Sequence, residues 1–413
     1  MSWPLRIATL NKGGWPAGMT HDIDFVRQRY RYARRSYAAV TDIPGTTFTR
    51  STAAYGEDTA GDLIQFASGV PRITNKGVLI EESRTNLLLQ SQTFDNAIWT
   101  KGSATINADV AVAPDGASTA DKLVENASTA QHLVLQSISV GASTYTYSVF
   151  VKAAERSWVF LQQDGIPTGQ YFNVSTGSLG SATGTPSAAS IVPYGNGWYR
   201  CIMTFTASAG TPAAYIMLAS GNNASDYTGD GTSGLYLWGA QLEAGSSATS
   251  YIPTTSTSAT RNTDVLASAN DPNPTAYTVV AEFTIPVTGP DYGHIWGYDD
   301  GTANNRAFVY YHRPFGKLWL EVLVGGVSVA SMDLGTATPG QSYKVAARIA
   351  ANDFAAIKTG GTLATDASGA VPATSSFRHG GSVAGSEFFG GVVKRIRRWS
   401  VGKTNSELQA LVA

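Results

Sequence analysis

The sequence predicts an all-β protein: two antiparallel β-sandwich (jelly-roll) domains, preceded by an extended N-terminal docking segment and followed by a short C-terminal helix. Three observations predict this class. Short runs of alternating apolar and polar residues recur along the chain. Gly, Ser, Thr and Asn separate these runs at short intervals. Only 14% of the 413 residues are charged, and the length suits two or three domains.

The composition excludes several classes of protein. Hydrophobic residues make up 43% of the chain, enough to bury real cores, and the net charge of −1 provides no field to attract nucleic acid. Cys201 is the single cysteine, so an internal disulfide is excluded. The N-terminal MSWPLRIATLNKGG lacks the apolar run of a signal peptide, and no stretch approaches the ~18 apolar residues of a membrane span. We therefore expect a protein made in a cytoplasm, without nucleic-acid or membrane partners.

Residues 1–85 are predicted to form the docking segment. Their turn-rich runs indicate an extended polypeptide laid along another protein, with little core of its own. The basic run RQRYRYARR, residues 27–35, places Arg27, Arg29 and Arg31 on one face at period two. An edge strand with a charged face fits this pattern. A nucleic-acid patch is the alternative, which the net charge disfavours.

Residues 86–253 are predicted to form the first sandwich. In residues 144–151, Tyr145, Tyr147, Val149 and Val151 share one face, and more polar residues share the other. Such alternation is typical of a half-buried antiparallel strand. Similar runs occupy 132–140, 157–164, 197–207, 214–220 and 235–243.

A Ser/Thr-rich linker is predicted at residues 254–264, and a second sandwich at 265–413. The second sandwich repeats the many-strand pattern of the first. Its last residues, NSELQALVA, offer Asn405 or Ser406 as an N-cap, Glu407 in the first turn, and leucines at helical spacing. This pattern predicts a short helix docked on the sandwich.

Several strings resemble a module of bacteriophage tail-fibre, tail-spike and head-spike proteins. They are GVLIEESRTNLLLQSQTFDNAIWTK (77–101), PDG (114–116) with TADKL (119–123), YTYSVFVKA (145–153), GNGWYRC (195–201) and GLYLWGAQLEAGSSATSYIPTT (234–255). The resemblance covers roughly residues 47–261 and implies a jelly roll like that of carbohydrate-binding modules.

The C-terminal part is similar to concanavalin-like or laminin-G-like sandwiches of the same viral proteins. The similar strings are SYKVAARIAANDFAAIKTGGTLATDASGAVP (342–372), GGVVKRIRRWS (390–400) and ELQAL (407–411). The resemblance implies a virion surface location, attachment to other virion proteins through the N-terminal segment, and a homotrimer. It does not name a ligand, because these folds carry many functions.

The chain shows no sign of an assembled reactive centre. Glycoside hydrolysis needs two carboxylates across a cleft. Glu81 and Glu82 are adjacent, as are Asp299 and Asp300, so in a strand the two side chains of each pair point to opposite faces. The G-x-S-x-G, H-E-x-x-H and P-loop motifs are absent from the sequence. We therefore expect no catalytic residue and no enzyme.

Structural calcium is the cofactor that the residues allow. Asp226 and Asp230 lie in a glycine-rich loop, and hard cations prefer carboxylate and carbonyl oxygens. The resemblance to carbohydrate-binding modules adds Asp95 near the first strand and Glu243 on the last. A plain turn is the alternative.

Aromatic residues are the candidates for sugar binding, because sugars stack their C–H faces on aromatic rings while polar groups contact the hydroxyls. The stretch YGHIWGYDDGTANNR, residues 292–306, mixes aromatic, acidic and amide side chains in a loop-like segment. The predicted glycan-binding residues are Trp296, Tyr298, Asp299, Asn305 and Tyr311. The alternative is that the tryptophans belong to the core.

The leading hypothesis is a virion surface adhesin that binds a polysaccharide of the host cell surface. The second is a purely structural baseplate, collar or capsid-decoration protein. The third, which is less favoured, is a polysaccharide depolymerase.

Overall fold

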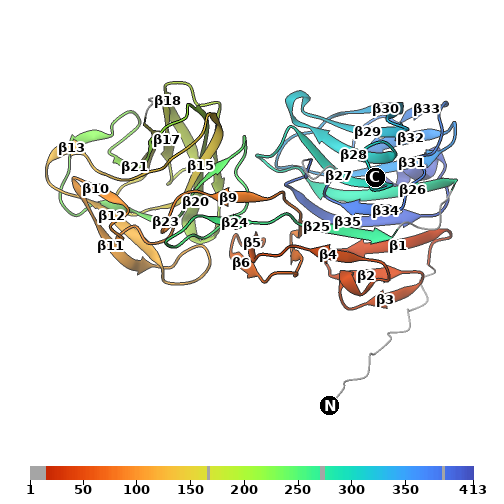
Figure 1. The fold of residues 1–413 in the computed structure, drawn as a ribbon, viewed down its shortest axis with the longest axis horizontal. Coiled ribbons are helices and arrows are strands. Elements are labelled where there is room, and N and C mark those ends of the chain that lie inside the picture. Colours follow the sequence, from red (N-terminus) through yellow and green to blue (C-terminus); the bar gives the residue numbers. More distant parts are fainter. Residues whose placement is uncertain (1–14, 165–167, 270–274, 384–386) are drawn as a thin grey trace, which may run out of the picture. The chain divides into compact units, whose positions relative to one another are not determined.

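The structure is a computed structural model that describes residues 15–164, 168–269, 275–383 and 387–413. The chain forms two compact units (Figure 1). Unit 1 contains Met1–Ser51, Phe66–Glu82 and Asn262–Ala413, and unit 2 contains Thr52–Gln65 and Ser83–Arg261. Strands dominate both units, which confirms the predicted all-β class with antiparallel sheets.

Unit 2 is a sandwich of two six-stranded sheets. The first, called the β16 sheet, has the spatial order β10 (Thr100–Gly102), β14 (Leu133–Ser137), β21 (Ala213–Ala219), β16 (Trp158–Gln163), β17 (Thr168–Asn173) and β18 (Ser178–Thr183). The second, called the β15 sheet, has the order β11 (Ala104–Ala111), β12 (Ala120–Glu125), β23 (Gly234–Ala244), β15 (Ser143–Ala153), β20 (Trp198–Ala207) and β19 (Ala188–Pro193).

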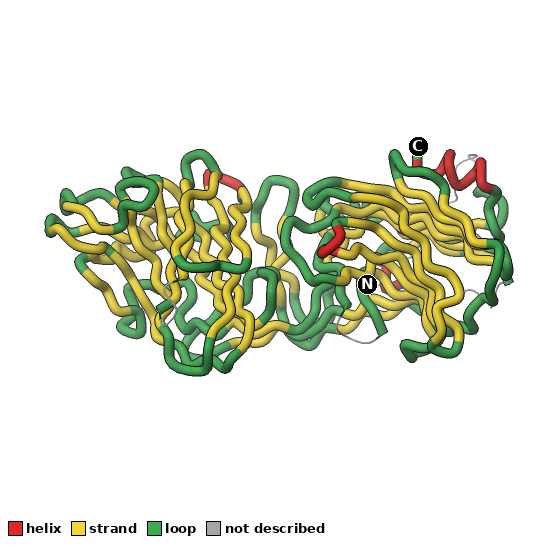
Figure 2. The backbone as a smooth tube through the Cα atoms, turned by 90° about the horizontal axis from the view of Figure 1, so that it is seen from above, coloured by secondary structure: helices red, strands yellow, loops and turns green. Residues whose placement is uncertain are grey.

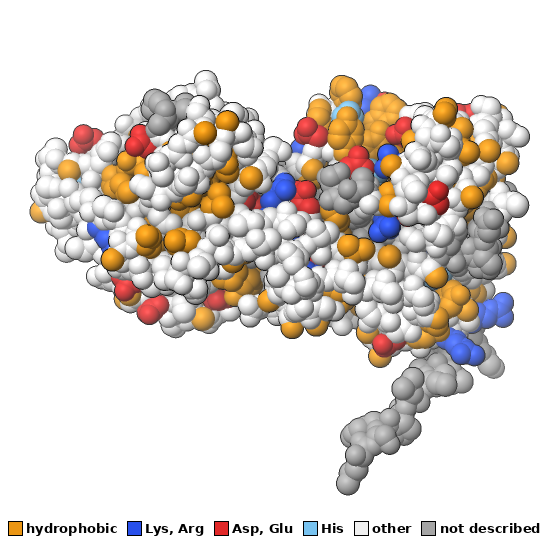
Figure 3. Space-filling model, in the orientation of Figure 1, with side chains coloured by type: hydrophobic (Ala, Val, Ile, Leu, Met, Phe, Trp, Pro, Cys, Tyr) orange, Lys and Arg blue, Asp and Glu red, His pale blue; other side chains and the backbone are white. Residues whose placement is uncertain are grey.

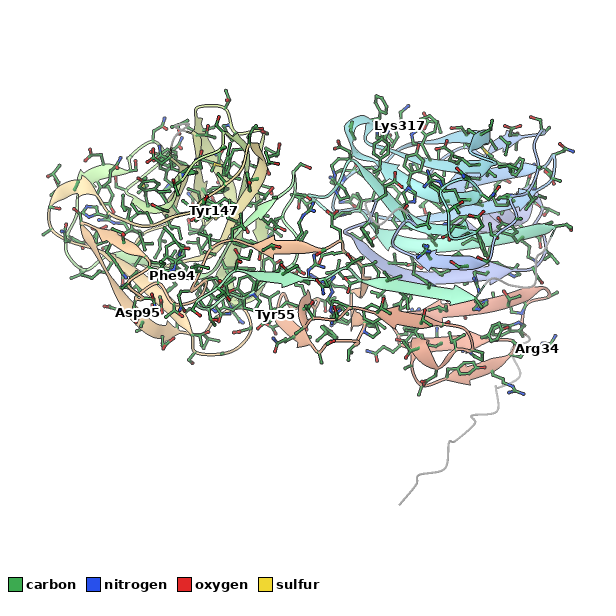
Figure 4. All side chains as sticks on the ribbon, viewed as in Figure 1. Arg34, Tyr55, Phe94, Asp95, Tyr147 and Lys317 are labelled. Atoms are coloured by element: carbon green, nitrogen blue, oxygen red, sulfur yellow. The ribbon has the colours of Figure 1, made fainter. Side chains whose placement is uncertain are left out.

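The core of unit 2 lies between these sheets and follows the alternation of the sequence. In β15, Tyr145, Tyr147, Val149 and Val151 point into the core. Figure 4 labels Tyr147 inside this sandwich. Alternate strand residues face opposite sides of a sheet, so the residues between them lie on the outer face. Phe150 is one of these, and it is nevertheless fully buried.

A neighbouring segment explains why Phe150 is buried. The hairpin of β5 (Ala54–Glu57) and β6 (Leu63–Phe66) places Tyr55 and Leu63 in a cluster with Phe150, Trp238 and Tyr251 on the outer face of the β15 sheet. Short pairs complete the unit: β13 (Thr129–Gln131) with β22 (Asp226–Thr228), and β9 (Arg84–Asn86) with β24 (Ala259–Arg261). A single-turn helix, η2 (Gly195–Gly197), precedes β20.

Unit 1 is a sandwich of a ten-stranded and a seven-stranded sheet. The ten-stranded sheet runs β3 (Arg35–Tyr37), β2 (Arg29–Tyr32), β1 (Met19–Asp24), β35 (Val392–Trp399), β26 (Ala276–Thr284), β31 (Ser342–Ala350), β32 (Phe354–Lys358) and β33 (Ala364–Asp366), with β7 (Arg72–Thr74) and β8 (Gly77–Leu79) attached at β35. The seven-stranded sheet runs β30 (Val327–Thr336), β29 (Lys317–Val324), β28 (Arg306–His312), β27 (Tyr292–Asp299), β34 (Ser376–His379), β25 (Val265–Ala269) and β4 (Thr47–Thr49).

The N-terminal strands are part of this sandwich, whereas the sequence predicts a separate docking segment at residues 1–85. Strand β1 pairs antiparallel with β35, with Ile23 opposite Ile396, and β4 pairs with β25. Ile23 and Phe25 are fully buried in the core of unit 1. Figure 1 shows β1, β2 and β3 (red) beside the C-terminal strands. Attachment of this segment to another protein stays a prediction.

The predicted linker also differs from the structure. Of residues 254–264, Ala259–Arg261 form β24, which pairs with β9. Asp264 is fully buried and accepts hydrogen bonds from Arg50, Arg72 and the backbone N–H of Glu81. Within this stretch, the chain passes from unit 2 to unit 1 between Arg261 and Asn262.

The C-terminal helix α1 (Asn405–Val412) lies on the outer face of the ten-stranded sheet (Figure 2). Leu408 and Val412 pack against Ala346, Ala355 and Ile357. Single-turn helices η1 (Val40–Asp42) and η3 (Arg313–Phe315) lie in loops of the same unit. Within the described residues, no helix combines the length and apolar character needed to cross a membrane.

Candidate functional site

The outer face of the seven-stranded sheet carries a row of aromatic side chains that we call the ladder face. It comprises Tyr292, His294, Arg306, Phe308, Tyr310, His312, Phe315 and Trp319, from β27, β28, η3 and β29. Helix α1 packs on β31 and β32 of the ten-stranded sheet. On the ladder face, His294, Phe308 and Tyr310 are buried. Tyr292 and Phe315 are exposed, so their end of the face is the part that is open to a ligand.

Strand pairing brings these residues together. Tyr292 lies opposite His312 and His294 lies opposite Tyr310 in the β27–β28 ladder. Tyr310 in turn lies opposite Trp319 on β29. Cross-strand partners on one face of a sheet are close enough for their side chains to touch.

The rings form contacts along the two strands. The Tyr292 and His312 rings are stacked with their centroids 4.5 Å apart, and the His294 and Phe308 rings are stacked at 4.3 Å. Phe315 meets His312 edge to face at 4.4 Å. Offset-stacked and edge-to-face contacts are the favoured arrangements of aromatic pairs, so the row holds its own geometry.

At one end of the ladder face, a carboxylate contacts a histidine and an arginine side chain. Glu387 lies 3.3 Å from both Nε2 of His294 and a guanidinium nitrogen of Arg306. The Arg306 guanidinium also lies over the Phe308 ring, 4.5 Å from its centroid. Burial lowers the pKa of His294 to about 4, against the opposing effect of Glu387. His294 is therefore neutral near pH 7, and Glu387 balances the charge of Arg306.

The other end of the ladder face is the most exposed. Tyr292 is 46% and Phe315 is 65% exposed, although both are large and hydrophobic. Nearby, Lys317 pairs with Asp333 at 2.6 Å. Figure 3 shows hydrophobic and histidine side chains gathered at the upper edge of unit 1, where Figure 4 labels Lys317. This end thus offers ring faces beside polar groups.

The three aromatic residues predicted to stack on sugars are not on the ladder face, which contradicts that prediction. Trp296, Tyr298 and Tyr311 are buried in the core of unit 1, and Tyr311 donates its hydroxyl to the Ala337 carbonyl. None of these rings has a face available at the surface.

The two predicted polar residues are engaged in turns and pairs. Asp299 is buried and forms an ion pair of 2.6 Å with Arg378. Asn305 donates to Asp300 and accepts from the Gly325 N–H, so its amide ties two hairpin turns together. These contacts fix the β27–β28 turn and leave neither side chain free for a sugar.

A β-bulge explains why the sequence pointed to the wrong rings. Strict alternation would put Tyr292, His294, Trp296 and Tyr298 on one face. The register shifts between His294 and Trp296, so the last two side chains turn into the core. In β28, by contrast, period two places Tyr310 on the outer face and Tyr311 in the core, a pattern that could have been read from RAFVYYH.

The four predicted calcium ligands do not form one site. Asp230 is hydrogen-bonded to Ser233 beside the start of β23, whereas Glu243 lies near the end of that strand, roughly 30 Å away along an extended chain. Asp226 lies on β22, and exposed Asp95, labelled in Figure 4, precedes β10. The described residues contain no cluster of three or more His, Cys, Asp or Glu side chains suited to a metal ion.

The carboxylates of two of these residues are engaged by the protein itself. Glu243 is buried and accepts hydrogen bonds from Gln241, Thr249 and the Thr249 N–H. Asp230 accepts from Thr232 and Ser233, and these bonds hold its pKa well below the usual range. The alternative to a calcium site, a plain turn closed by its own hydrogen bonds, fits the contacts of Asp230.

Unit 2 has a smaller aromatic surface on the outer face of the β16 sheet. The Phe160 and Tyr171 rings are stacked at 4.1 Å, and Trp158, Tyr215 and Met217 adjoin them. The Tyr215 hydroxyl lies 3.4 Å from the Asp164 carboxylate. Phe160, Tyr171 and Met217 are buried, and no ring of this cluster is as exposed as Tyr292 or Phe315.

No protein-family model and no curated protein match the chain. Among solved structures, it is similar to the carbohydrate-binding module CBM40 of the Ruminococcus gnavus IT-sialidase bound to α2,3-sialyllactose: identity 17%, TM-score 0.30, covering 36% of this chain and 93% of that one. Domains LG4-5 of the mouse laminin α1 chain match at 10% identity and a TM-score of 0.27, covering 67% and 90%. The CBM22-1–CBM22-2 tandem of Paenibacillus barcinonensis Xyn10C matches at 14% and 0.24, covering 80% and 94%. These identities and TM-scores are too low to assign a function to this chain.

Proposed function

We propose that this chain is a non-enzymatic glycan-binding protein and that the ladder face of unit 1 is its sugar-binding surface. One observation carries the proposal: Tyr292 and Phe315 are exposed at the same end of the ladder face, and both rings contact His312. Exposed apolar groups gathered in one place mark a binding site more often than single exposed residues do.

The chemistry of the face suits a carbohydrate. The C–H face of a pyranose stacks on an aromatic ring, and its hydroxyls need donors and acceptors at the rim. Tyr292 and Phe315 flank His312 and provide the rings. The Lys317–Asp333 pair supplies polar atoms with no net charge, which favours a neutral segment of glycan.

The test is binding of the purified chain to a glycan array and to bacterial surface polysaccharide, before and after Tyr292→Ala and Phe315→Ala. Each loss of a stacking ring should weaken binding about three- to tenfold. Val327→Ala is the matched control, because Val327 is as exposed as Phe315, at 65%, but lies on β30 beside the far end of β29. Its binding should equal that of the parent chain.

Two results would contradict the assignment. The first is unchanged binding in both ring variants. The second is equal weakening by Val327→Ala, which would indicate a general effect on the fold. If Trp158→Ala, on the β16 sheet of unit 2, abolishes binding while the ladder variants keep it, the sugar site belongs to unit 2 instead.

We further propose that the chain acts at the surface of a virus particle as a homotrimeric adhesin for a host polysaccharide. The support is the resemblance of its sequence strings to phage tail and head proteins. Addition of the purified chain should block adsorption of the parent particle to its host. Unblocked adsorption would favour a purely structural role, and shortening of host polysaccharide by the purified chain would favour a depolymerase.

A further inference from the structure

The edge of the ten-stranded sheet carries an excess of positive charge in a chain whose net charge is −1. Strands β1, β2 and β35 place Arg29, Arg31, Arg395 and Arg397 on one outer face, where Asp22 and Asp24 lie between them. Asp24 pairs with Arg27 and Arg29, and Asp22 pairs with Arg31 and Arg395.

These carboxylates leave part of the charge unbalanced. Arg397 lies on β35, three strands inward from β3, over the Trp399 ring at 5.7 Å and under the influence of Asp22 and Glu282. Arg34 and Arg35, at the turn and on β3, are exposed. Figure 3 shows Lys and Arg side chains gathered at this edge, and Figure 4 labels Arg34 there. The edge therefore attracts an acidic group.

The turn that presents Arg34 is conformationally unfavourable. Ala33 and Arg34 have φ values of 46° and 67°. Two-residue hairpin turns with positive φ at both positions favour Asn-Gly, since side chains with a Cβ are disfavoured there. The local preference of a two-residue turn therefore does not explain Ala33 and Arg34 at this turn.

Strand β3 is the outermost strand of the sheet, and no described segment pairs with its outer side. An edge strand presents unpaired N–H and C=O groups, which a further extended segment can bind. The backbone of β3 thus offers hydrogen bonds next to the exposed Arg34 and Arg35.

We propose that the edge formed by β2 and β3 is a docking site for an extended acidic segment of a different protein, which adds to the sheet beside β3. A second copy of this chain does not suit the edge, because two β3 strands side by side would bring like charges together. Residues 1–14 do not suit it either, since they carry Arg6 and Lys12 and no acidic residue. The outer face here has no exposed aromatic ring, which disfavours a sugar.

The experiment measures fluorescence anisotropy of labelled peptides with the full chain. The probe is a peptide of about ten residues alternating Asp with Thr or Val, a pattern that suits strand addition. The same peptide with Asn in place of Asp, and one with alternate N-methylated amides, are the controls. The acidic peptide should bind at least about tenfold more tightly than either control and lose affinity as salt rises.

Two variants locate the site. Arg35→Glu should weaken binding of the acidic peptide about tenfold. Arg34→Gly should also weaken binding while it maintains or raises the melting temperature, because glycine relieves the positive φ. Lys344→Glu, on β31 of the same sheet, is the control and should bind like the parent chain.

Three outcomes would overturn the proposal. Equal binding of the Asn peptide would remove the role of charge. Equal binding of the N-methylated peptide would remove strand addition. Tighter binding of oligothymidylate or heparin than of the acidic peptide would assign the edge to a nucleic acid or an acidic polysaccharide.

Discussion

Single residues in β27 differ sharply in environment because of one bulge. His294 lies on the ladder face, whereas Trp296 lies in the core two positions later. The sequence singled out rings of β27, two of which the bulge turns into the core, whereas the proposed sugar-binding surface uses Tyr292 of the same strand. Alternation can be read from residue types, whereas an inserted residue is set by the pairing of neighbouring strands.

Buried histidines predict a pH dependence at the scale of the residue. Burial, aided by Arg398, lowers the pKa of His379 to about 3, and burial lowers that of His294 to about 4. In the unfolded chain a histidine has a pKa of about 6.5, so the unfolded state binds more protons below this pH. The free energy of unfolding should therefore fall as pH drops from about 6.5 toward 4, by up to about 1.4 kcal/mol per pH unit for each histidine.

The variant His379→Gln separates this contribution from that of the carboxylates. It removes one titrating group beside Ser268, whose Oγ lies 3.0 Å from Nε2. Urea denaturation at several pH values should show a shallower fall for the variant below pH about 6.5, and parallel curves above pH about 7. Parallel curves over the whole range would refute the buried neutral histidine.

At the scale of the element, the structure confirms the predicted short helix α1, but its N-cap is Thr404 and not the predicted Asn405 or Ser406. Thr404 accepts from the Glu407 N–H, and Glu407 accepts from the Thr404 N–H at 2.8 Å. Hydrogen bonds from Lys403 and Thr404 lower the pKa of Glu407 to about 2. An eight-residue helix is not stable alone, so these caps act together with the packing of Leu408.

Loss of the cap should therefore be measurable. Thr404→Ala is expected to lower the free energy of unfolding of unit 1 by about 1 kcal/mol. Gln409→Ala, at an exposed position of the same helix, is the control and should change it by less than about 0.5 kcal/mol. Denaturant titration of both variants checks this, and equal stability of the two would argue against a role for the cap.

At the scale of the whole molecule, the chain enters each unit more than once. Glu81 belongs to unit 1 and pairs with Arg72, whereas Arg84, three residues later, belongs to unit 2 and lies 3.8 Å from Glu243. Composition changes little across these crossings, so boundaries predicted from linker-like stretches miss them. Asp264, at the end of the predicted linker, is a buried anion in unit 1.

This ion network predicts a change confined to one unit. Asp264→Asn leaves Arg50 and Arg72 buried without that carboxylate, which should destabilise unit 1 by about 3–5 kcal/mol. Asp333→Asn breaks the half-exposed pair with Lys317 and should cost less than about 1 kcal/mol. In scanning calorimetry, Asp264→Asn should lower one transition and leave another in place. If every transition moved to a lower temperature by the same amount, the two units would not unfold independently.

The sequence by itself determined that the chain is all-β, with strands of alternating polarity and a capped C-terminal helix, because side-chain period and capping are local properties. The tertiary structure alone decided that β1 pairs with β35, that β5 and β6 cover one sheet of unit 2, and that Tyr292 and Phe315 lie open while Trp296 is buried. Those outcomes depend on pairing between residues far apart in the chain, and on a bulge whose position such pairing sets. Neither the pairing nor the position of the bulge can be read from the residue types along one strand.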